Sequence, residues 1–241
     1  MQKTKYGLSF VAATFSVLQL VACGGDNSTS VSGSEYDADN NVLTDLRDGK
    51  TYKAVTIGTQ TWMAENLNYE TANSYCYNGT SSNCTKYGRL YTWAAAMDSV
   101  GTWSTNSKGC GYGTTCSPTY PVRGICPEGW HLPDTTEWHT LFTAVGGKST
   151  AGTMLKSAEG WKDYDGVSGN GSDSYSFSAL PAGSGAFGGG YLNEGYFTYF
   201  WSSTEYNSLN AYNMSLFRSS ANAILNYYYM YYGYSVRCVK D

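Results

Sequence analysis

The cysteines restrict the possible folds of this chain more than any other feature. Of the seven, Cys23 ends an apolar N-terminal stretch, and the other six lie in the region 76–238. An even number of cysteines in an exported chain predicts a domain held together by disulfides. No two of them have the Cys-x-x-Cys spacing that is typical of a redox or zinc site. The predicted disulfide cysteines are Cys76, Cys84, Cys110, Cys116, Cys126 and Cys238.

Six cysteines can pair in many ways, and sequence proximity favours one of them. Cys76–Cys84 and Cys110–Cys116 would close short local loops, which leaves Cys126–Cys238 as the third pair. This last bridge would close more than a hundred residues. The chain-entropy model gives such a bridge roughly 4–5 kcal/mol of stabilisation, less any strain.

The N-terminus is typical of a bacterial lipoprotein signal peptide. Lys3 and Lys5 form a positive region, an uncharged apolar stretch covers 7–22, and Leu20-Val21-Ala22-Cys23 resembles a lipobox. The apolar stretch is too short for a convincing membrane span. We therefore expect cleavage before Cys23 and acylation of its thiol, so that acyl chains hold the protein on a membrane. The alternative is an ordinary signal peptide that ends near a cysteine by chance.

Charge limits the partners of the processed chain. Residues 1–22 contain two of the 15 basic residues and none of the 19 acidic ones, so 13 basic and 19 acidic residues remain, a formal charge of −6. This charge opposes binding to nucleic acid or to anionic lipid head groups. Gly24, which follows the lipidated cysteine, favours the outer membrane over the inner one. We expect a lipid-anchored protein of the cell envelope that faces the periplasm or the cell surface.

Composition divides the chain into three parts. Residues 1–22 are the predicted signal peptide, and 23–42 are predicted to form a lipidated flexible tether, because they contain almost no apolar residues. Residues 43–241 have a uniform, aromatic-rich texture, which predicts one domain with its own core.

Within this domain, helices are predicted first and strands later. A hairpin is predicted over 51–63 around Gly58-Thr59, and a short helix over 90–97. Asp134 and Glu137 predict the capping box of a second helix that ends at Gly146-Gly147. Further strands are predicted over 175–180, 196–202, 211–217 and 223–239. The predicted class is α+β, with antiparallel sheets, two to three short helices and long loops.

Six segments in this order resemble the Fibrobacter succinogenes major paralogous domain, which occurs in many exported bacterial lipoproteins. They are DGKTY at 48–52, QTWMAENL at 60–67, GRLYTW at 88–93, CPEGWHLP at 126–133, FWSSTE at 200–205 and SVRCV at 235–239. The family looks like a branch of the C-type-lectin-like fold. The resemblance implies that N- and C-terminal strands pair and that a helix begins near a cysteine bridged to the last strand. Cys126 and Cys238 match this bridge.

Two known sites of the broader fold have no counterpart here. Leu132-Pro133-Asp134 is not the calcium loop of animal C-type lectins, and Trp201 is followed by Ser202-Ser203. The reactive cysteine pair of the formylglycine-generating enzymes is also missing. We therefore predict no metal ion and no cofactor.

The strongest candidate site is a tyrosine-rich region near the C-terminus. The run NYYYMYYGY at 226–234 must place tyrosines on both faces of a strand, and 206–213 has a similar Tyr/Asn/Ser composition. Tyrosine supplies a large, stiff contact surface at low entropy cost. The pattern also resembles the ligand-facing variable segments of retroelement-diversified lectin-like proteins. The alternative is that these tyrosines serve only as β-formers of a half-buried sheet. The predicted ligand-binding residues are Tyr206, Asn207, Asn210, Tyr212, Asn213, Tyr228, Tyr229, Tyr231, Tyr232 and Tyr234.

These features favour a non-enzymatic recognition or adhesion module that binds a carbohydrate or a surface protein. One alternative is a structural envelope protein without a soluble ligand, and the other is a glycan-active enzyme. His131 and His139 do not form a metalloprotease motif, and no nucleophile elbow or phosphate loop is found. Asp163, Asp165 and Asp173 lie in a Gly/Ser-rich stretch, and we interpret them as solvated loop acids rather than as glycosidase carboxylates or a calcium loop.

Overall fold

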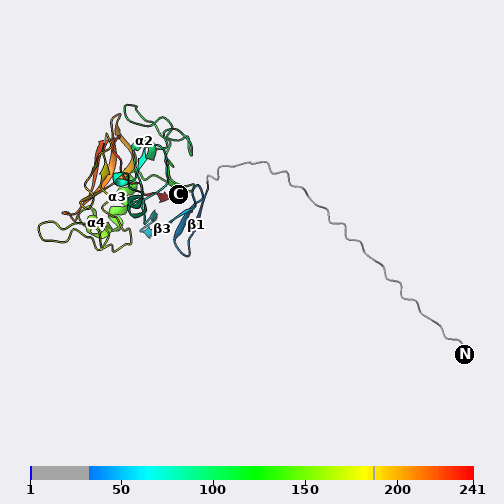
Figure 1. Cartoon of the computed structure of the whole chain (residues 1–241), viewed down its shortest axis with the longest axis horizontal. Coiled ribbons are helices and arrows are strands. Elements are labelled where there is room, and N and C mark those ends of the chain that lie inside the picture. The colour runs from blue at the N-terminus through cyan, green and yellow to red at the C-terminus, as the bar shows by residue number, and fades with distance from the viewer. Residues whose placement is uncertain (2–32, 187) are drawn as a thin grey trace. The chain divides into compact units, whose positions relative to one another are not determined.

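Strands from both ends of the domain form one antiparallel sheet in the computed structural model, which describes residues 1, 33–186 and 188–241 (Figure 1). The strand order is β1-β2-β3-β4-β13-β7. Val239 in β13 pairs with both Trp62 in β4 and His131 in β7, so the C-terminal strand pairs with the N-terminal β3–β4 hairpin, whereas β1 pairs only with β2. The strands are β1 (Ser34–Asp37), β2 (Val42–Asp45), β3 (Lys50–Ile57), β4 (Gln60–Met63), β7 (Trp130–His131) and β13 (Val239–Lys240).

The predicted hairpin over 51–63 is confirmed as β3 and β4. Ile57 pairs with Gln60, so the connection has two residues. Gly58 has a positive φ of 62°, which the first position of such a tight turn requires.

The domain begins earlier than the composition predicts. Residues 34–42 were assigned to the flexible tether, but β1 pairs with β2, and Tyr36 contacts Trp130 edge to face at 5.6 Å between ring centroids. The tether prediction is therefore wrong for its last part. The ladder with β2, the Tyr36–Trp130 contact and the hydrogen bond from the Ser34 hydroxyl to the Glu128 carbonyl hold this polar segment on the domain. The predicted lipidation site Cys23 and nearly all of the signal peptide lie outside the described residues.

A second, three-stranded antiparallel sheet consists of β10 (Phe197–Asn207), β11 (Asn210–Phe217) and β12 (Ala223–Tyr229). The predictions at 196–202 and 211–217 are confirmed, whereas the predicted strand over 223–239 ends at Tyr229 and the one over 175–180 is absent. Two small two-stranded sheets complete the strands: β5 (Ser74–Tyr75) with β6 (Leu90–Tyr91), and β8 (Ser184–Gly185) with β9 (Tyr191–Leu192).

The described residues form four α-helices, one more than the upper prediction. In α3 (Thr135–Ala144) both bonds of the predicted capping box are present. The helix predicted over 90–97 is shortened to α2 (Trp93–Ala96), because Leu90 and Tyr91 pair in β6 instead. The others are α1 (Ser81–Tyr87) and α4 (Lys148–Leu155), with a 3₁₀ turn η1 (Tyr77–Gly79) before α1.

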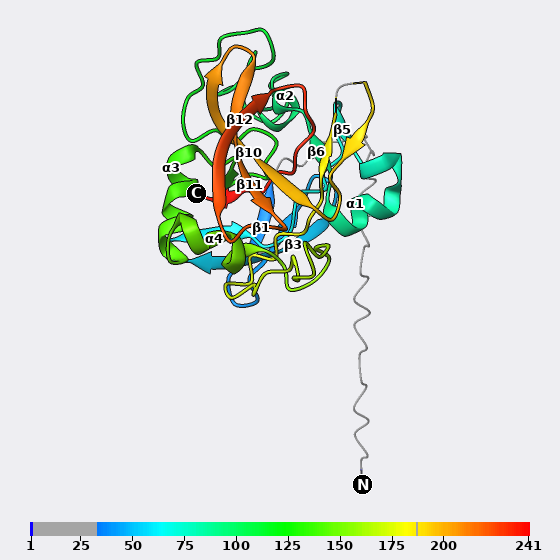
Figure 2. The ribbon, with the colours of Figure 1, turned by 90° about the vertical axis from the view of Figure 1, so that its left-hand side faces the viewer.

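The β10–β12 sheet lies between two hydrophobic clusters, and α3 and α4 cover one of its faces (Figures 1 and 2). On that face Trp138 contacts Phe200 and Trp62. On the other face Trp201 packs against Tyr234. The α+β class with antiparallel sheets is thus confirmed.

All three predicted disulfides are formed. The Cα atoms are 4.8 Å apart in Cys76–Cys84, 4.9 Å in Cys110–Cys116 and 6.0 Å in Cys126–Cys238. Three disulfides fit an extracytoplasmic location. No helix of the described part of the chain has both the length and the apolar character that a membrane crossing requires.

Candidate functional site

The predicted tyrosine surface lies at one end of the β10–β12 sheet. The helices cover the other end, where the apolar pairs Met214–Leu225 and Leu216–Ala223 face the core. Beyond the helices, Tyr227, Tyr228 and Tyr229 are each 41–43% exposed, although successive residues point to opposite faces. The sheet end therefore presents tyrosines on both faces. We call this end of the sheet the tyrosine tip. Its members are Tyr206, Tyr212, Tyr227, Tyr228, Tyr229, Tyr231 and Tyr232.

On one face, Tyr206, Tyr212 and Tyr227 form a compact group. The rings of Tyr206 and Tyr227 are stacked with centroids 3.6 Å apart, and Tyr212 meets both edge-on. The hydrogen bond between the phenols of Tyr206 and Tyr227 raises the pKa of Tyr206 above its ordinary value. Tyr227 is not among the ligand-binding residues predicted from the sequence, although its place in the tyrosine run signalled it.

On the opposite face, Tyr228 and Tyr232 lie over two buried rings. Tyr228 meets Tyr232 edge-on at 6.1 Å, and Tyr232 stacks on Tyr234 at 5.9 Å. Tyr234 in turn packs between Tyr199 and Trp201 and is 2% exposed. Burial raises the pKa of Tyr199 to about 12. The prediction that Tyr234 contacts a ligand is wrong, because its ring belongs to the core that supports the surface.

A disulfide loop brings a further tyrosine to the tip. The Gly113 N–H donates to the Ser208 carbonyl at 2.7 Å, and the Cys116 N–H donates to the Glu205 carboxylate at 2.7 Å. These bonds hold the 110–116 loop beside the β10–β11 turn (Figure 2). Tyr112, 51% exposed, thereby reaches within 5.3 Å of the Tyr231 ring centroid. Tyr112 is not among the residues predicted from the sequence, because only the fold shows where its loop lies.

The predicted asparagines divide into turn residues and a buried one. The Asn207 side-chain oxygen accepts from the backbone N–H groups of Leu209 and Asn210, and so shapes the hairpin turn at the tip. Asn213 is fully buried, donates to the Asn226 carbonyl and accepts from the Ser215 hydroxyl. The prediction that Asn213 contacts a ligand is wrong for that reason.

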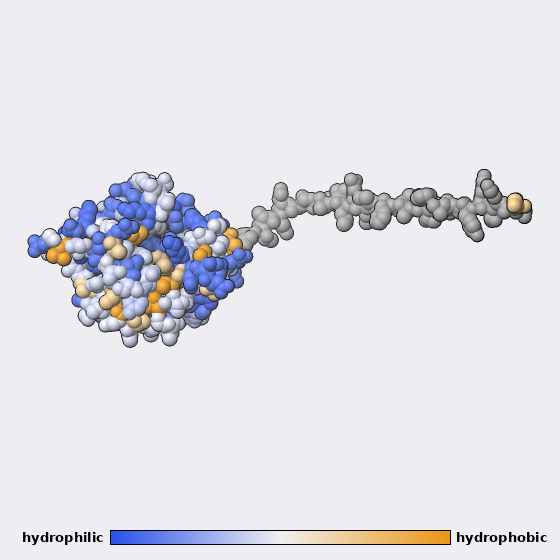
Figure 3. All heavy atoms as spheres, turned by 90° about the horizontal axis from the view of Figure 1, so that it is seen from below, coloured by the Kyte–Doolittle hydropathy of each residue, from blue (hydrophilic) through white to orange (hydrophobic). Residues whose placement is uncertain are grey.

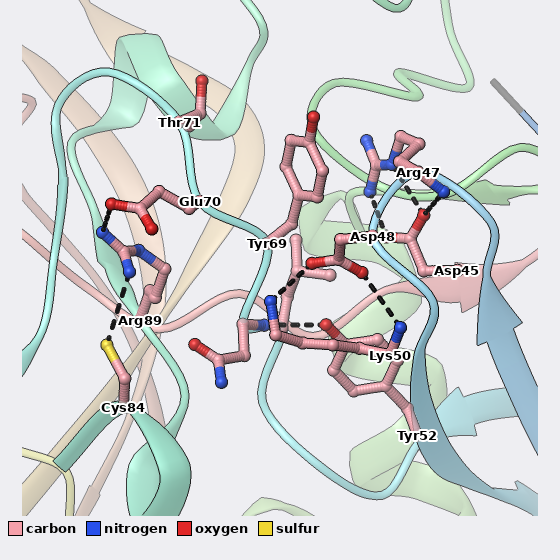
Figure 4. A network of polar contacts seen from close by, with 12 residues as sticks. Asp45, Arg47, Asp48, Lys50, Tyr52, Tyr69, Glu70, Thr71, Cys84 and Arg89 are labelled. Atoms are coloured by element: carbon pink, nitrogen blue, oxygen red, sulfur yellow. Dashed lines mark hydrogen bonds and ion pairs between the residues drawn. The ribbon is translucent and has the colours of Figure 1, made fainter. Parts of the chain in front are cut away.

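A polar pocket of about 1110 Å³ lies elsewhere, between β3, the end of α1 and the 157–180 region. Figure 4 shows the polar network beside it, in which Lys50 binds Asp48 at 2.5 Å and the Tyr52 hydroxyl accepts from the Asn68 N–H. The pocket is lined by side chains of both charges. The basic ones include Lys53, Lys86 and Arg237, and the acidic ones are Glu65, Glu159 and Asp173.

The three acids considered for glycoside hydrolysis do not share one pocket. Asp173 lines the larger pocket, and its carboxylate accepts from the Ser178 N–H and hydroxyl. Asp165 lines a separate pocket of about 400 Å³, whereas Asp163 lines neither. Within 33–186 and 188–241, no three His, Cys, Asp or Glu side chains are grouped so that they could hold a metal ion.

One protein-family model matches the chain from within β3 to β13. The model, described as the Fibrobacter succinogenes major domain, matches residues 55–240. The chain belongs to this family. The resemblance seen in the sequence motifs is thereby confirmed, and the Fibrobacter succinogenes major domain contains the Cys126–Cys238 bridge and the whole tyrosine tip. Comparisons with the curated proteins and with the solved structures find no match.

Proposed function

We propose that this protein is a non-enzymatic recognition module that binds neutral carbohydrate through its tyrosine tip. The observation that carries the proposal is that the tip combines exposed aromatic rings with an absence of charge in the segments that build it. Residues 109–122, 206–217 and 219–236 contain no Asp, Glu, Lys, Arg or His. The carboxylate of the neighbouring Glu205 accepts from the Cys116 N–H within the fold.

This surface chemistry suits a sugar better than other ligands. An aromatic face packs against the apolar face of a sugar ring, while phenol and amide groups hydrogen-bond its hydroxyls. Nucleic acids and acidic polysaccharides need cationic groups, which the tip lacks. On the face of the domain that Figure 3 shows, viewed from below, hydrophobic residues lie only in small groups among hydrophilic ones.

The proposal includes a frame and a location. The frame is a C-type-lectin-like domain, supported by the pairing of the C-terminal strand β13 with β4 of the N-terminal hairpin and by the Cys126–Cys238 bridge. The location is the outer membrane, with acyl chains on Cys23 as the anchor and the domain outside the cytoplasm. The recognition step uses neither a metal ion nor a cofactor.

Retention on insoluble polysaccharides tests the proposal. The purified full chain is incubated with cellulose, xylan and mannan, with anionic alginate as the charged comparison. We expect at least one neutral polysaccharide to retain the wild type, Tyr228→Ala/Tyr232→Ala to abolish retention, and alginate to retain neither. Tyr75→Ala/Tyr164→Ala removes two similarly exposed rings outside the tip and should change nothing.

Two results would contradict the proposal. One is that no neutral polysaccharide retains the wild type, and the other is that the tip variant is retained as well as the wild type. If the wild type instead co-purifies in a large protein assembly, and the Tyr228→Ala/Tyr232→Ala variant does not, the result would support a structural envelope protein.

A further inference from the structure

Four tyrosines of the tip form a continuous row of rings. Along Tyr112, Tyr231, Tyr232 and Tyr228, successive ring centroids are 5.3, 5.2 and 6.1 Å apart. Tyr112 and Tyr228 at the two ends are exposed, and the two middle rings are half-buried. Such a row offers consecutive contacts to a ligand that is itself a chain of ring-sized units.

The row is not flat. Successive ring planes are inclined by 59°, 32° and 82°. A planar crystalline polysaccharide surface would need rings that lie in one plane. Inclined rings suit a single chain whose sugar units can turn relative to one another.

The row is fixed before a ligand arrives. The Cys110–Cys116 disulfide and the bonds to Ser208 and Glu205 hold the loop that carries Tyr112. At the other end, Tyr228 belongs to β12 and pairs with Ala211. Pre-ordered side chains lose little conformational entropy on binding, which favours affinity.

The two ends of the row, Tyr112 and Tyr228, are open to solvent. The pockets of about 1110 and 400 Å³ are lined by other residues. Recognition of the terminal sugar of a glycan needs walls around the chain end, whereas an open row can contact units within a chain.

We infer that the tip binds the interior of a single linear neutral glycan, with three or more consecutive sugar units along Tyr112, Tyr231, Tyr232 and Tyr228, and that the Cys110–Cys116 loop supplies the last contact. This inference rests on the proposed function and adds the form of the ligand. According to this inference, Tyr112, which lies outside the C-terminal tyrosine run, determines the length of the glycan chain that the tip recognises.

Calorimetry with soluble oligosaccharides of increasing length tests it. Cello-, xylo- and manno-oligosaccharides from the monosaccharide to the hexasaccharide are titrated into the purified full chain. We expect no measurable binding of the monosaccharide and an affinity that rises with length beyond the trisaccharide. Tyr112→Ala should weaken binding of the longest ligand roughly tenfold, and leave the shortest ligand that binds unaffected.

Two further variants control for indirect effects. Cys110→Ser/Cys116→Ser removes the covalent restraint on the loop and should weaken binding of long ligands, as Tyr112→Ala does. Cys76→Ser/Cys84→Ser removes the other local disulfide, which lies away from the tip, and should leave binding unchanged.

The outcomes separate this inference from the proposed function. Length-independent binding, an unchanged hexasaccharide affinity in Tyr112→Ala, or retention by crystalline cellulose without binding of any soluble oligosaccharide would overturn the inference while glycan recognition stands. A wild type that binds neither the oligosaccharides nor the neutral polysaccharides would remove the proposed function itself.

Discussion

Tyr206 and Tyr227 lie face to face, with ring planes 6° apart, although β10 and β12 are not neighbours in the sheet. Tyr212 on the intervening strand meets Tyr206 at 5.6 Å and Tyr227 at 6.2 Å between ring centroids. The three rings therefore connect all three strands beyond the end of the helix-covered core. They support the sheet end that carries the proposed binding row.

This stacking predicts an energetic coupling between two exposed residues. A double-mutant cycle with Tyr206→Ala and Tyr227→Ala, measured by urea unfolding, should give a coupling of about 0.5–1.5 kcal/mol. The pair Tyr75→Ala and Tyr206→Ala, whose rings make no contact with each other, should give additive effects. Additivity in the first cycle would show that the stacked rings do not stabilise the tip.

The disulfides should differ in their contribution to stability because they close loops of different length. Replacing Cys126 and Cys238 by Ala opens a loop of 112 residues and should lower the free energy of unfolding by roughly 4–5 kcal/mol. The same change at Cys76 and Cys84, 8 residues apart, should cost roughly 2–3 kcal/mol. Urea unfolding of the two double variants measures both values, and a reversed order would contradict the prediction.

Arg237 should be a major stabilising residue of the 173–178 loop. Its side chain is 1% exposed, burial lowers its pKa to about 9, and its Nη atoms donate to the carbonyls of Phe177 and Ser178. Arg237→Met would leave these buried acceptors without their donor, so we expect a loss of about 2–4 kcal/mol in urea unfolding.

Lys240→Met provides the comparison for Arg237, because it removes an exposed positive charge from the same C-terminal region. It should change stability by no more than about 0.5 kcal/mol. Equal unfolding midpoints for the two variants would show that the buried guanidinium does not hold the loop.

His131 should make stability depend on pH. Its Nδ1 is 2.7 Å from the Asp241 carboxylate, and its Nε2 is 2.6 Å from that of Glu137 in α3. Burial lowers the pKa of His131, but its hydrogen bonds and attraction to the two carboxylates outweigh this, so that the pKa is raised above 6.5.

A raised folded-state pKa gives stability that is complete below the unfolded-state pKa of about 6.5 and is lost as pH rises through the folded-state value. The stability advantage of the wild type over His131→Gln should therefore be larger at about pH 5.5 than at about pH 8.5. Urea unfolding at both pH values measures it. His139→Gln, at an exposed position of α3, should show no such difference, and a pH-independent advantage of His131 would refute the ion-pair interpretation.

The features determined by the sequence itself are local. The capping box of α3 joins residues three apart, the β3–β4 turn depends on Gly58, and two disulfides close short loops. The family motifs also lie in the sequence and identify the frame. The capping box, the turn and the two short disulfides depend on neighbours along the chain, so nothing about distant partners was needed to predict them. The Cys126–Cys238 bridge followed because it was the pair that remained.

Only the tertiary structure decided which residues are buried. Tyr36 belongs to the domain because its ring packs against Trp130. Tyr234 is buried because Tyr199 and Trp201 pack against its ring. Tyr112 joined the tip because its loop binds Ser208, which is distant in sequence. A tyrosine suits a core and a surface equally well, so its role is fixed by the elements that pack against it, and these are brought together only by folding.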